Sequence, residues 1–280
     1  MTNLPPSLSE VNCVMTCWQQ WFWRYIRKIQ RPLRPEPMEK GSLIHHGLAV
    51  YYGKYPHDVI TASQAMYTLG NRDWEHYSTL AVAEPDADEA KKFQAMLVQC
   101  ERILKLYDQH YQGEQLSIGG VETEFTYPLH RIVDMVTMDD NGLVWAWEHK
   151  TSSKMPELSA LTATMEPALT CLACGANGII YNIITTDPIK FARQDFTISQ
   201  EQKDYALNWY QHISGIITAQ YEFQKHHGSY FEFPVHNRTC NWCEYLKLCQ
   251  LMSSGRDTEE AMARLYIPKR DRDREVDTDG

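Results

Sequence analysis

A short hairpin in the second half of the chain constrains the fold more than any other segment. Residues 139–142 (DDNG) fit a type I turn followed by a glycine in the left-handed conformation, with strand-like runs on both sides. A hairpin closed in this way places Asp134 directly opposite Glu148. Residues two apart in a strand share a face, so Lys150 lies beside Glu148. The sequence therefore predicts two carboxylates and a lysine at one end of a hairpin.

This group of side chains has the composition of a metal site for phosphate chemistry. Two carboxylates this close repel each other unless a cation neutralises them, and hard oxygen ligands suit Mg²⁺ or Mn²⁺. A lysine beside the metal orients or deprotonates a water and stabilises charge on a phosphate. The alternative is an exposed salt-bridge ladder, because D…ExK spacings also arise by chance. A four-residue loop would also change the register.

Two other residues are candidates for the same site. The segment GSLIH ends at His45, an imidazole ligand on a helix, whereas His46 faces about 100° away, so only one of the two points at a given site. Glu122 opens the first strand of the sheet and supplies or supports a further carboxylate. An exposed position is an equally good interpretation of Glu122 and of Glu124.

The order of elements along the chain predicts the fold class. We expect a basic, aromatic helix over residues 7–30, a proline-rich linker, a helix over 38–53, and a helical region over 56–112 with an acidic interruption around Pro85. Short β-branched and aromatic runs from Ser117 then predict a meander of strands.

A helix over residues 157–175 follows, and then two neighbouring strands, GIIYNIITT and FARQDFTI. Ser199 and Gln202 form a capping box ahead of a long helix that ends near Gly228. This order predicts an α/β protein with a central mixed sheet flanked by helices.

The cysteines are distributed unevenly. Cys240, Cys243 and Cys249 form a tight group of three, and soft sulfur ligands of this kind favour zinc or an iron–sulfur cluster. Cys17 is the candidate fourth ligand, with Cys13 one helical turn earlier as its competitor. Such a metal would join the two ends of the chain. The alternative is that these thiols are small buried apolar groups.

The pair Cys171 and Cys174 lies in an Ala- and Leu-rich helix with no third ligand nearby, which is typical of core cysteines. With neither a signal peptide nor an apolar run long enough to span a membrane, we expect a cytoplasmic protein, in the host cytoplasm if the protein is viral. Thiols in that compartment stay reduced, so the cysteines are not expected to form disulfides.

The charge of the chain is segregated along the sequence. The formal net charge of −9 over 280 residues excludes a polycation that coats nucleic acid unspecifically. Basic residues nevertheless gather in the N-terminal helix, where Arg24, Arg27 and Lys28 are candidates for contacting DNA phosphates. For these three residues a structural role is an equally good interpretation, and the neighbouring tryptophans fit packing better than base stacking.

Together, these motifs resemble the PD-(D/E)XK nuclease superfamily, and in particular its RecB-like branch with an iron–sulfur cluster. That branch includes CRISPR-associated adaptation nucleases and phage recombination exonucleases. The matching pieces follow in the family's order: Cys17 with WQQWFWRYIRKI, GSLIH with His45, VETEF with Glu122, RIVD with Asp134, EHKTS with Glu148 and Lys150, and the C-x2-C-x5-C group.

The resemblance implies a restriction-endonuclease-like core and assigns roles to these residues. Asp134, Glu148 and His45 would hold Mg²⁺ or Mn²⁺, and Lys150 would activate water. Cys17 and the three late cysteines would hold [4Fe–4S], with zinc as the alternative, in a lobe formed from both chain ends.

The sequence departs from the family pattern at two places. A Gln-x3-Tyr motif is expected on the helix after the ExK strand, where this chain has Glu166 and Thr170 at the nearest positions. The glycine expected just before the RIVD strand is replaced by His130 or Arg131.

The expected organisation has four parts. Residues 1–37 carry the aromatic helix, 38–235 form the nuclease core with a helical insertion at about 56–112, 236–255 carry the cysteines, and 256–280 form a disordered charged tail.

The leading prediction is a metal-dependent DNA exonuclease in recombination, repair or phage DNA processing, acting on single strands or duplex ends. One alternative is a CRISPR-adaptation nuclease that trims spacer precursors with a partner protein. The other is a DNA-binding accessory subunit with an impaired nuclease site.

Overall fold

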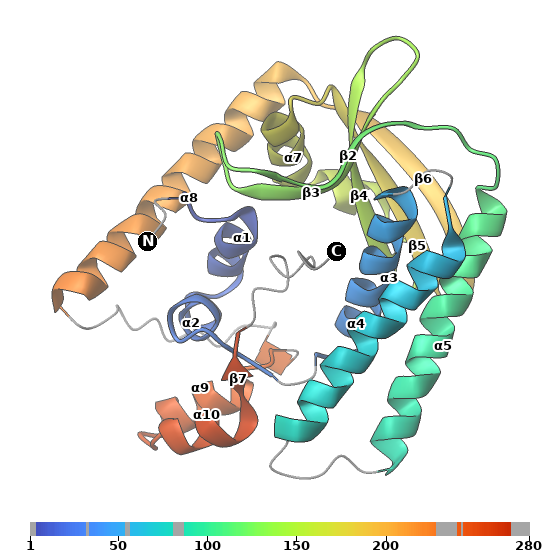
Figure 1. Ribbon diagram of the computed structural model, residues 1–280. Helices are drawn as coiled ribbons and strands as arrows, with labels where there is room; N and C mark the ends of the chain where they lie inside the picture. Colours follow the sequence, from blue (N-terminus) through green and yellow to red (C-terminus); the bar gives the residue numbers. More distant parts are fainter. Residues whose placement is uncertain are drawn as a thin grey trace.

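The centre of the protein is a five-stranded sheet with the strand order β2–β3–β4–β5–β6 (Figure 1). The computed structural model describes residues 4–31, 34–53, 57–80, 87–227, 240–241 and 243–269. The strands of the sheet are β2 (Ser117–Phe125), β3 (Arg131–Met138), β4 (Val144–Ser152), β5 (Gly178–Thr186) and β6 (Ile189–Thr197). β4 and β5 run parallel and the other neighbours antiparallel, so the sheet is mixed, as predicted.

The parallel pair at the centre requires a crossover connection. Two helices lie in it: α6 (Leu158–Thr162) and α7 (Glu166–Cys174). β5 pairs with β4 on one side and β6 on the other, and most of its side chains are buried. Its nearly continuous apolar sequence is typical of a strand that is covered on both faces of the sheet.

Helices cover both faces of the sheet (Figure 1). One face packs against α3 (Glu36–Gly53), α4 (Val59–Leu80) and α5 (Ala87–His110), around buried residues such as Leu48, Leu104 and Trp147. On the other side lie α7, the long α8 (Gln200–His227) and α1 (Leu8–Thr16). The predicted capping box is present at the start of α8, where the Ser199 and Gln202 side chains each accept a hydrogen bond from the other's backbone N–H.

The predicted hairpin register is confirmed along the paired part of β3 and β4. Gly142 has a φ of +78°, and the Asp139 N–H donates to the Leu143 carbonyl at 3.0 Å. The pairing runs from Met138 opposite Val144 to Met135 opposite Trp147. The turn residues therefore set which side chains face each other at the far end of the hairpin.

The N-terminal segment differs from the single helix expected over residues 7–30. The chain leaves the helical conformation at Cys17, whose φ is −168° and ψ 118°. α1 ends there, α2 (Trp18–Trp21) begins, and the π-helical turn η1 (Phe22–Ile26) follows. The break lets the Trp21 indole N–H donate to the Glu10 carboxylate at 2.8 Å, a buried contact between non-local residues that local sequence does not indicate.

Residues 22–30 and 243–269, from near the two ends of the chain, meet in a small lobe. β1 (Ile29–Gln30) pairs antiparallel with β7 (Ile267–Pro268), next to α9 (Leu246–Ser253) and α10 (Glu259–Leu265). Residues up to 269 are thus ordered, in contrast to the tail expected from residue 256, because Met262, Tyr266 and Ile267 bury apolar surface. Residues 270–280 and the expected interruption around Pro85 lie outside the described residues. Among the described helices, none combines the length and apolarity needed to cross a membrane.

Neighbouring isoleucines in α8 test its packing. Ile217 is fully buried, whereas Ile216 is 38% exposed. We expect Ile217→Ala to lower the free energy of unfolding by about 2–5 kcal/mol, because it leaves a cavity, and Ile216→Ala to change it by about 0.5 kcal/mol or less. Urea unfolding measures both values, and equal effects would contradict this arrangement of α8.

Candidate active site

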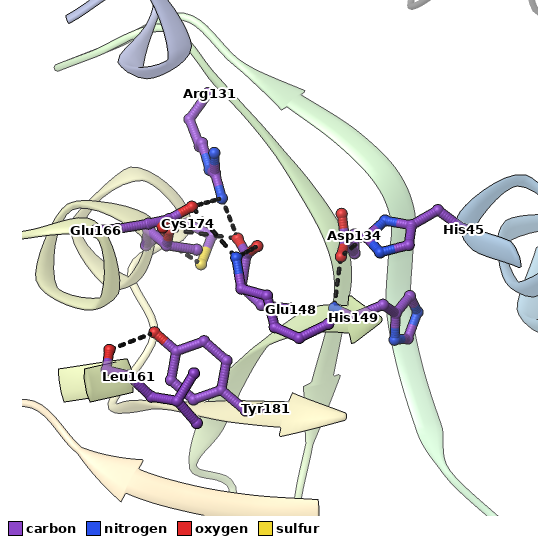
Figure 2. Close-up of polar contacts among 11 residues, drawn as sticks. His45, Arg131, Asp134, Glu148, His149, Leu161, Glu166, Cys174 and Tyr181 are labelled. Carbon is purple, nitrogen blue, oxygen red and sulfur yellow. Dashed lines mark hydrogen bonds and ion pairs between the residues drawn. The ribbon is translucent and has the colours of Figure 1, made fainter. Parts of the chain in front are cut away.

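The site lies where β3 and β4 separate beyond their last pair, Met135 opposite Trp147. The Asp134 carboxylate accepts a hydrogen bond from the His149 backbone N–H at 2.6 Å, which fixes it against β4 (Figure 2). Its Oδ2 atom also lies 3.7 Å from Nδ1 of His45, which α3 contributes. β3, β4 and α3 thus bring an imidazole and a carboxylate together.

Glu148 lies in a different set of contacts. Its side chain is only 5% exposed and forms an ion pair with Arg131, the first residue of β3. The Thr170 hydroxyl lies 3.4 Å from Glu148 Oε1, and Lys150 Nζ lies 3.5 Å from Oε2. Both carboxylate oxygens therefore face a positively charged side chain of the protein.

Glu166 completes a network of two cations and two carboxylates. It lies 3.1 Å from the Arg131 guanidinium (Figure 2) and 3.5 Å from Lys150 Nζ. Because positions four apart on a helix are neighbours, α7 directs Thr170 at Glu148 and Glu166 at the two cations that pair with Glu148. The two residues that replace the expected Gln-x3-Tyr pair thus both contact this network.

The network keeps its two cations charged. Burial lowers the pKa of Arg131 and of Lys150, but the Glu148 and Glu166 carboxylates outweigh that effect and raise both pKa values above their usual range. Lys150 is therefore suited to stabilising negative charge. Its Nζ also lies 5.9 Å from the centre of the Tyr181 ring.

His149 supports the site from the α3 side of the sheet. Its ring is buried, accepts a hydrogen bond from the Asn182 amide at Nδ1 (2.9 Å), and stacks on Tyr52 with a centroid distance of 6.0 Å. It also meets the His45 ring edge to face at 5.7 Å. Burial, together with the neighbouring His45 and Arg193, lowers the pKa of His149 well below 6.5, so the ring is a neutral packing surface for His45.

The alternation of side chains along β3 breaks at Asp134. Val133 packs in the cluster that contains Cys171 of α7, whereas Met135 packs in the cluster of α3–α5, although the two positions should share a face. The partner strand is irregular at the same place, since Glu122 has a φ of +47°. This is the physical reason why Asp134 contacts His45 while Glu148 contacts α7, a difference from the shared face expected for the two carboxylates.

The other expected site residues are placed as follows. Val121 pairs with Met135 and Thr123 pairs with Val133, so Glu122 of β2 lies across from Asp134 of β3. Glu124 pairs instead with His130 at 2.8 Å.

The expected DNA-contacting residues of the N-terminal segment lie in the lobe at the chain ends. Arg27 makes two hydrogen bonds to Glu259, at 2.7 and 2.9 Å. Arg24 lines a small cavity with Cys243, and the Lys28 carbonyl accepts from the Lys269 N–H. For Arg27, the contact with Glu259 supports a structural role.

The expected cysteine ligands lie in the same lobe. Burial, together with the neighbouring Cys249 and Cys17, raises the pKa of Cys243 to about 11. Burial raises the pKa of Cys249, and Cys17 and Cys240 raise it as well, so Cys17, Cys240 and Cys243 each lie within electrostatic reach of Cys249.

The described residues contain no group of three His, Cys, Asp or Glu side chains arranged closely enough to hold a metal ion. The donor types at both locations suit the expected metals, but the arrangement does not close around one. At the carboxylate site the reason is visible, because Glu148 is held by Arg131 while Asp134 and His45 lie together.

Sequence reasoning missed the roles of Arg131, His149 and Asn182. Asp134 was expected on the same face as Glu148. Arg131 is three residues from Asp134, so a regular strand would have put Arg131 on the opposite face, away from Glu148. The sequence did single out Glu166 and Thr170, because they occupy the positions of the expected Gln-x3-Tyr motif. The contact of Glu166 with Arg131 and that of Thr170 with Glu148 require the crossover that brings α7 to β4.

A substitution tests the support behind the site. Asn182→Ala removes the hydrogen bond to buried His149 and should lower the free energy of unfolding by about 1–3 kcal/mol, the cost of an unsatisfied buried group. Asn208→Ala, on the exposed side of α8, is the matched control. Urea unfolding that gave the same result for both variants would contradict the role assigned to Asn182.

Comparison with known proteins identifies the family. A family model described as the PD-(D/E)XK nuclease superfamily matches residues 5–250. No curated protein matches the chain. A solved structure titled "Crystal structure of SSO0001" is similar over 78% of this chain and 87% of that one, with 14% identity and a TM-score of 0.34, a likeness too distant to support statements about function. The mixed sheet flanked by helices is consistent with a restriction-endonuclease-like core, and because the family model spans most of its length, the chain belongs to the PD-(D/E)XK nuclease superfamily.

Proposed function

We propose that this protein is a metal-dependent exonuclease that hydrolyses phosphodiester bonds in DNA. The observation that carries the proposal is the end of the β3–β4 hairpin, where Glu148 lies beside Lys150 and Asp134 lies beside His45 of α3. Carboxylates, a lysine and an imidazole at one end of a hairpin suit the hydrolysis of a phosphate ester. Family membership supports the same class of reaction.

Mg²⁺ or Mn²⁺ fits the donor types of the site, which are two carboxylates and an imidazole. Asp134, Glu148 and His45 would hold the ion once Glu148 is released from Arg131. When bound, the ion would supply Lewis-acid polarisation of the phosphate.

The chain's own residues would do the rest of the chemistry. A water attacks the phosphorus in line while the bond to the leaving oxygen breaks, and the proton that the water gives up balances the one that the leaving oxygen takes up. Lys150 stabilises the negative charge that develops on the phosphate oxygens, since its ammonium group lies beside the carboxylates. The His149 N–H fixes Asp134 before substrate arrives, so this carboxylate needs no reorganisation.

The proposed setting is recombination, repair or phage DNA processing in the cytoplasm, with single strands or duplex ends as substrate. Trimming of spacer precursors in CRISPR adaptation, within a complex, uses the same chemistry. A DNA-binding accessory subunit is the second candidate, and the pairing of Glu148 with Arg131 is the observation that favours it.

We further propose that Cys17, Cys240, Cys243 and Cys249 hold a [4Fe–4S] cluster that joins the chain ends. The extended backbone of Cys17 interrupts the N-terminal helices, and Cys17 affects both Cys243 and Cys249 electrostatically. Those two thiols pack against the apolar cluster of Trp23 and Tyr245. Thiolate donors are also compatible with zinc, which elemental analysis distinguishes.

The nuclease proposal is tested with end-labelled single- and double-stranded DNA in Mg²⁺ and then Mn²⁺. We expect Glu148→Gln and Lys150→Ala to lower the cleavage rate by about 10²–10⁴-fold. Exposed Glu222→Gln and Lys190→Ala are the matched controls and should cleave like the unaltered protein. Folded protein that degrades neither substrate, with no difference among the variants, would favour the accessory-subunit alternative.

The cluster proposal predicts a brown protein after purification without oxygen, with about four iron and four sulfide ions per chain. Cys243→Ala should lose the iron and destabilise the lobe of chain ends, whereas Cys100→Ala, in the core around α5, should keep the iron. Cys13→Ala should also keep it, in contrast to Cys17→Ala. A colourless protein containing zinc would overturn the cluster in favour of a zinc site.

A further inference from the structure

Arg131 occupies an unusual place for a cation in a site that is to bind a metal. Its side chain is 12% exposed, and its guanidinium pairs with Glu148, one of the carboxylates proposed to hold the ion. An ion bound at Glu148 Oε1 would require the oxygen that the guanidinium already contacts, and the two positive charges repel each other. The contact seen here and the metal-bound arrangement are therefore mutually exclusive at Glu148 Oε1.

Glu166 gives the guanidinium a second carboxylate within reach. It lies 3.1 Å from the same Nη2 atom that contacts Glu148. A buried arginine without any carboxylate partner would strongly destabilise the folded protein, because its charge would be unpaired. An arginine that keeps one carboxylate still has most of its buried charge neutralised. Arg131 can therefore release Glu148 and stay paired.

The charges of the network balance in the absence of any ion. Arg131 and Lys150 offset Glu148 and Glu166, so the buried carboxylate Glu148 is neutralised by the protein alone. Without Arg131, Lys150 alone would face two carboxylates, and the remaining negative charge would have to be neutralised by a cation from solution. Two features explain this balance: an arginine at the start of β3 and a glutamate on α7.

We infer that Arg131 is a positioning residue that competes with the metal ion for Glu148, and that Glu166 receives the guanidinium when the ion binds. This inference rests on the proposed metal site and adds a built-in competitor to it. It makes the metal affinity depend on the pair Arg131 and Glu166 together.

The test measures Mn²⁺ binding by the loss of the electron paramagnetic resonance signal of free Mn²⁺, without DNA. We expect Arg131→Gln to bind Mn²⁺ about tenfold more tightly, and Glu166→Gln about tenfold more weakly, because Arg131 then has only Glu148 as partner. In the Arg131→Gln background, Glu166→Gln should have little further effect. Exposed Glu222→Gln is the control for loss of a carboxylate.

The double variant separates competition from a general charge effect. If Glu166 acted only through its own charge, Glu166→Gln would weaken binding equally in both backgrounds, and that result would overturn the inference. Unchanged or weaker binding by folded Arg131→Gln would overturn it as well. If Arg131→Gln does not fold, Arg131→Lys replaces it, because lysine lacks the planar group that spans Glu148 and Glu166; it should also reduce the effect of Glu166→Gln.

The same titration distinguishes failure of this inference from failure of the proposed function. Glu148→Gln that binds Mn²⁺ as the unaltered protein does would remove the proposed metal site itself, and the inference with it. Glu148→Gln that loses binding, together with additive effects of Arg131→Gln and Glu166→Gln, would leave the metal site in place and overturn the competition alone.

Discussion

The arrangement of the site depends on neutralising the charge of one buried carboxylate, Glu148. Glu148 is almost inaccessible to solvent, and an ionised carboxylate in such a place is costly unless cations and hydrogen bonds surround it. The partners come from three elements: Arg131 from β3, Lys150 from β4, and Thr170 from α7. The crossover between the parallel strands β4 and β5 brings α7 to this position, so the topology of the sheet and the electrostatics of Glu148 depend on each other.

The site also uses both faces of the sheet. The irregularity of β2 and β3 around Glu122 and Asp134 turns Asp134 to the His45 side, where neutral, buried His149 supports it. Glu148 stays on the α7 side. Binding of one ion by both carboxylates, as proposed above, would therefore require Glu148 to leave Arg131.

Much of the fold could be predicted from local sequence, since turn chemistry, strand alternation and capping are local. The DDNG turn set the register of β3 and β4, and the capping box at Ser199 marked the start of α8. Three features could not be predicted in this way: the break at Cys17, the folding of residues 259–268, and the contacts of Arg131. Each depends on burial against residues far along the chain, such as Tyr221 hydrogen-bonded to Glu10 or Tyr266 stacked on Tyr245.

The most direct test of this metal site is a crystal structure of the protein soaked in Mn²⁺, with the ion located by its anomalous scattering. We expect a peak bound by Asp134, Glu148 and His45, with the Arg131 guanidinium on Glu166 alone. A peak elsewhere, or an ion held by Asp134 while Arg131 still pairs with Glu148, would contradict it.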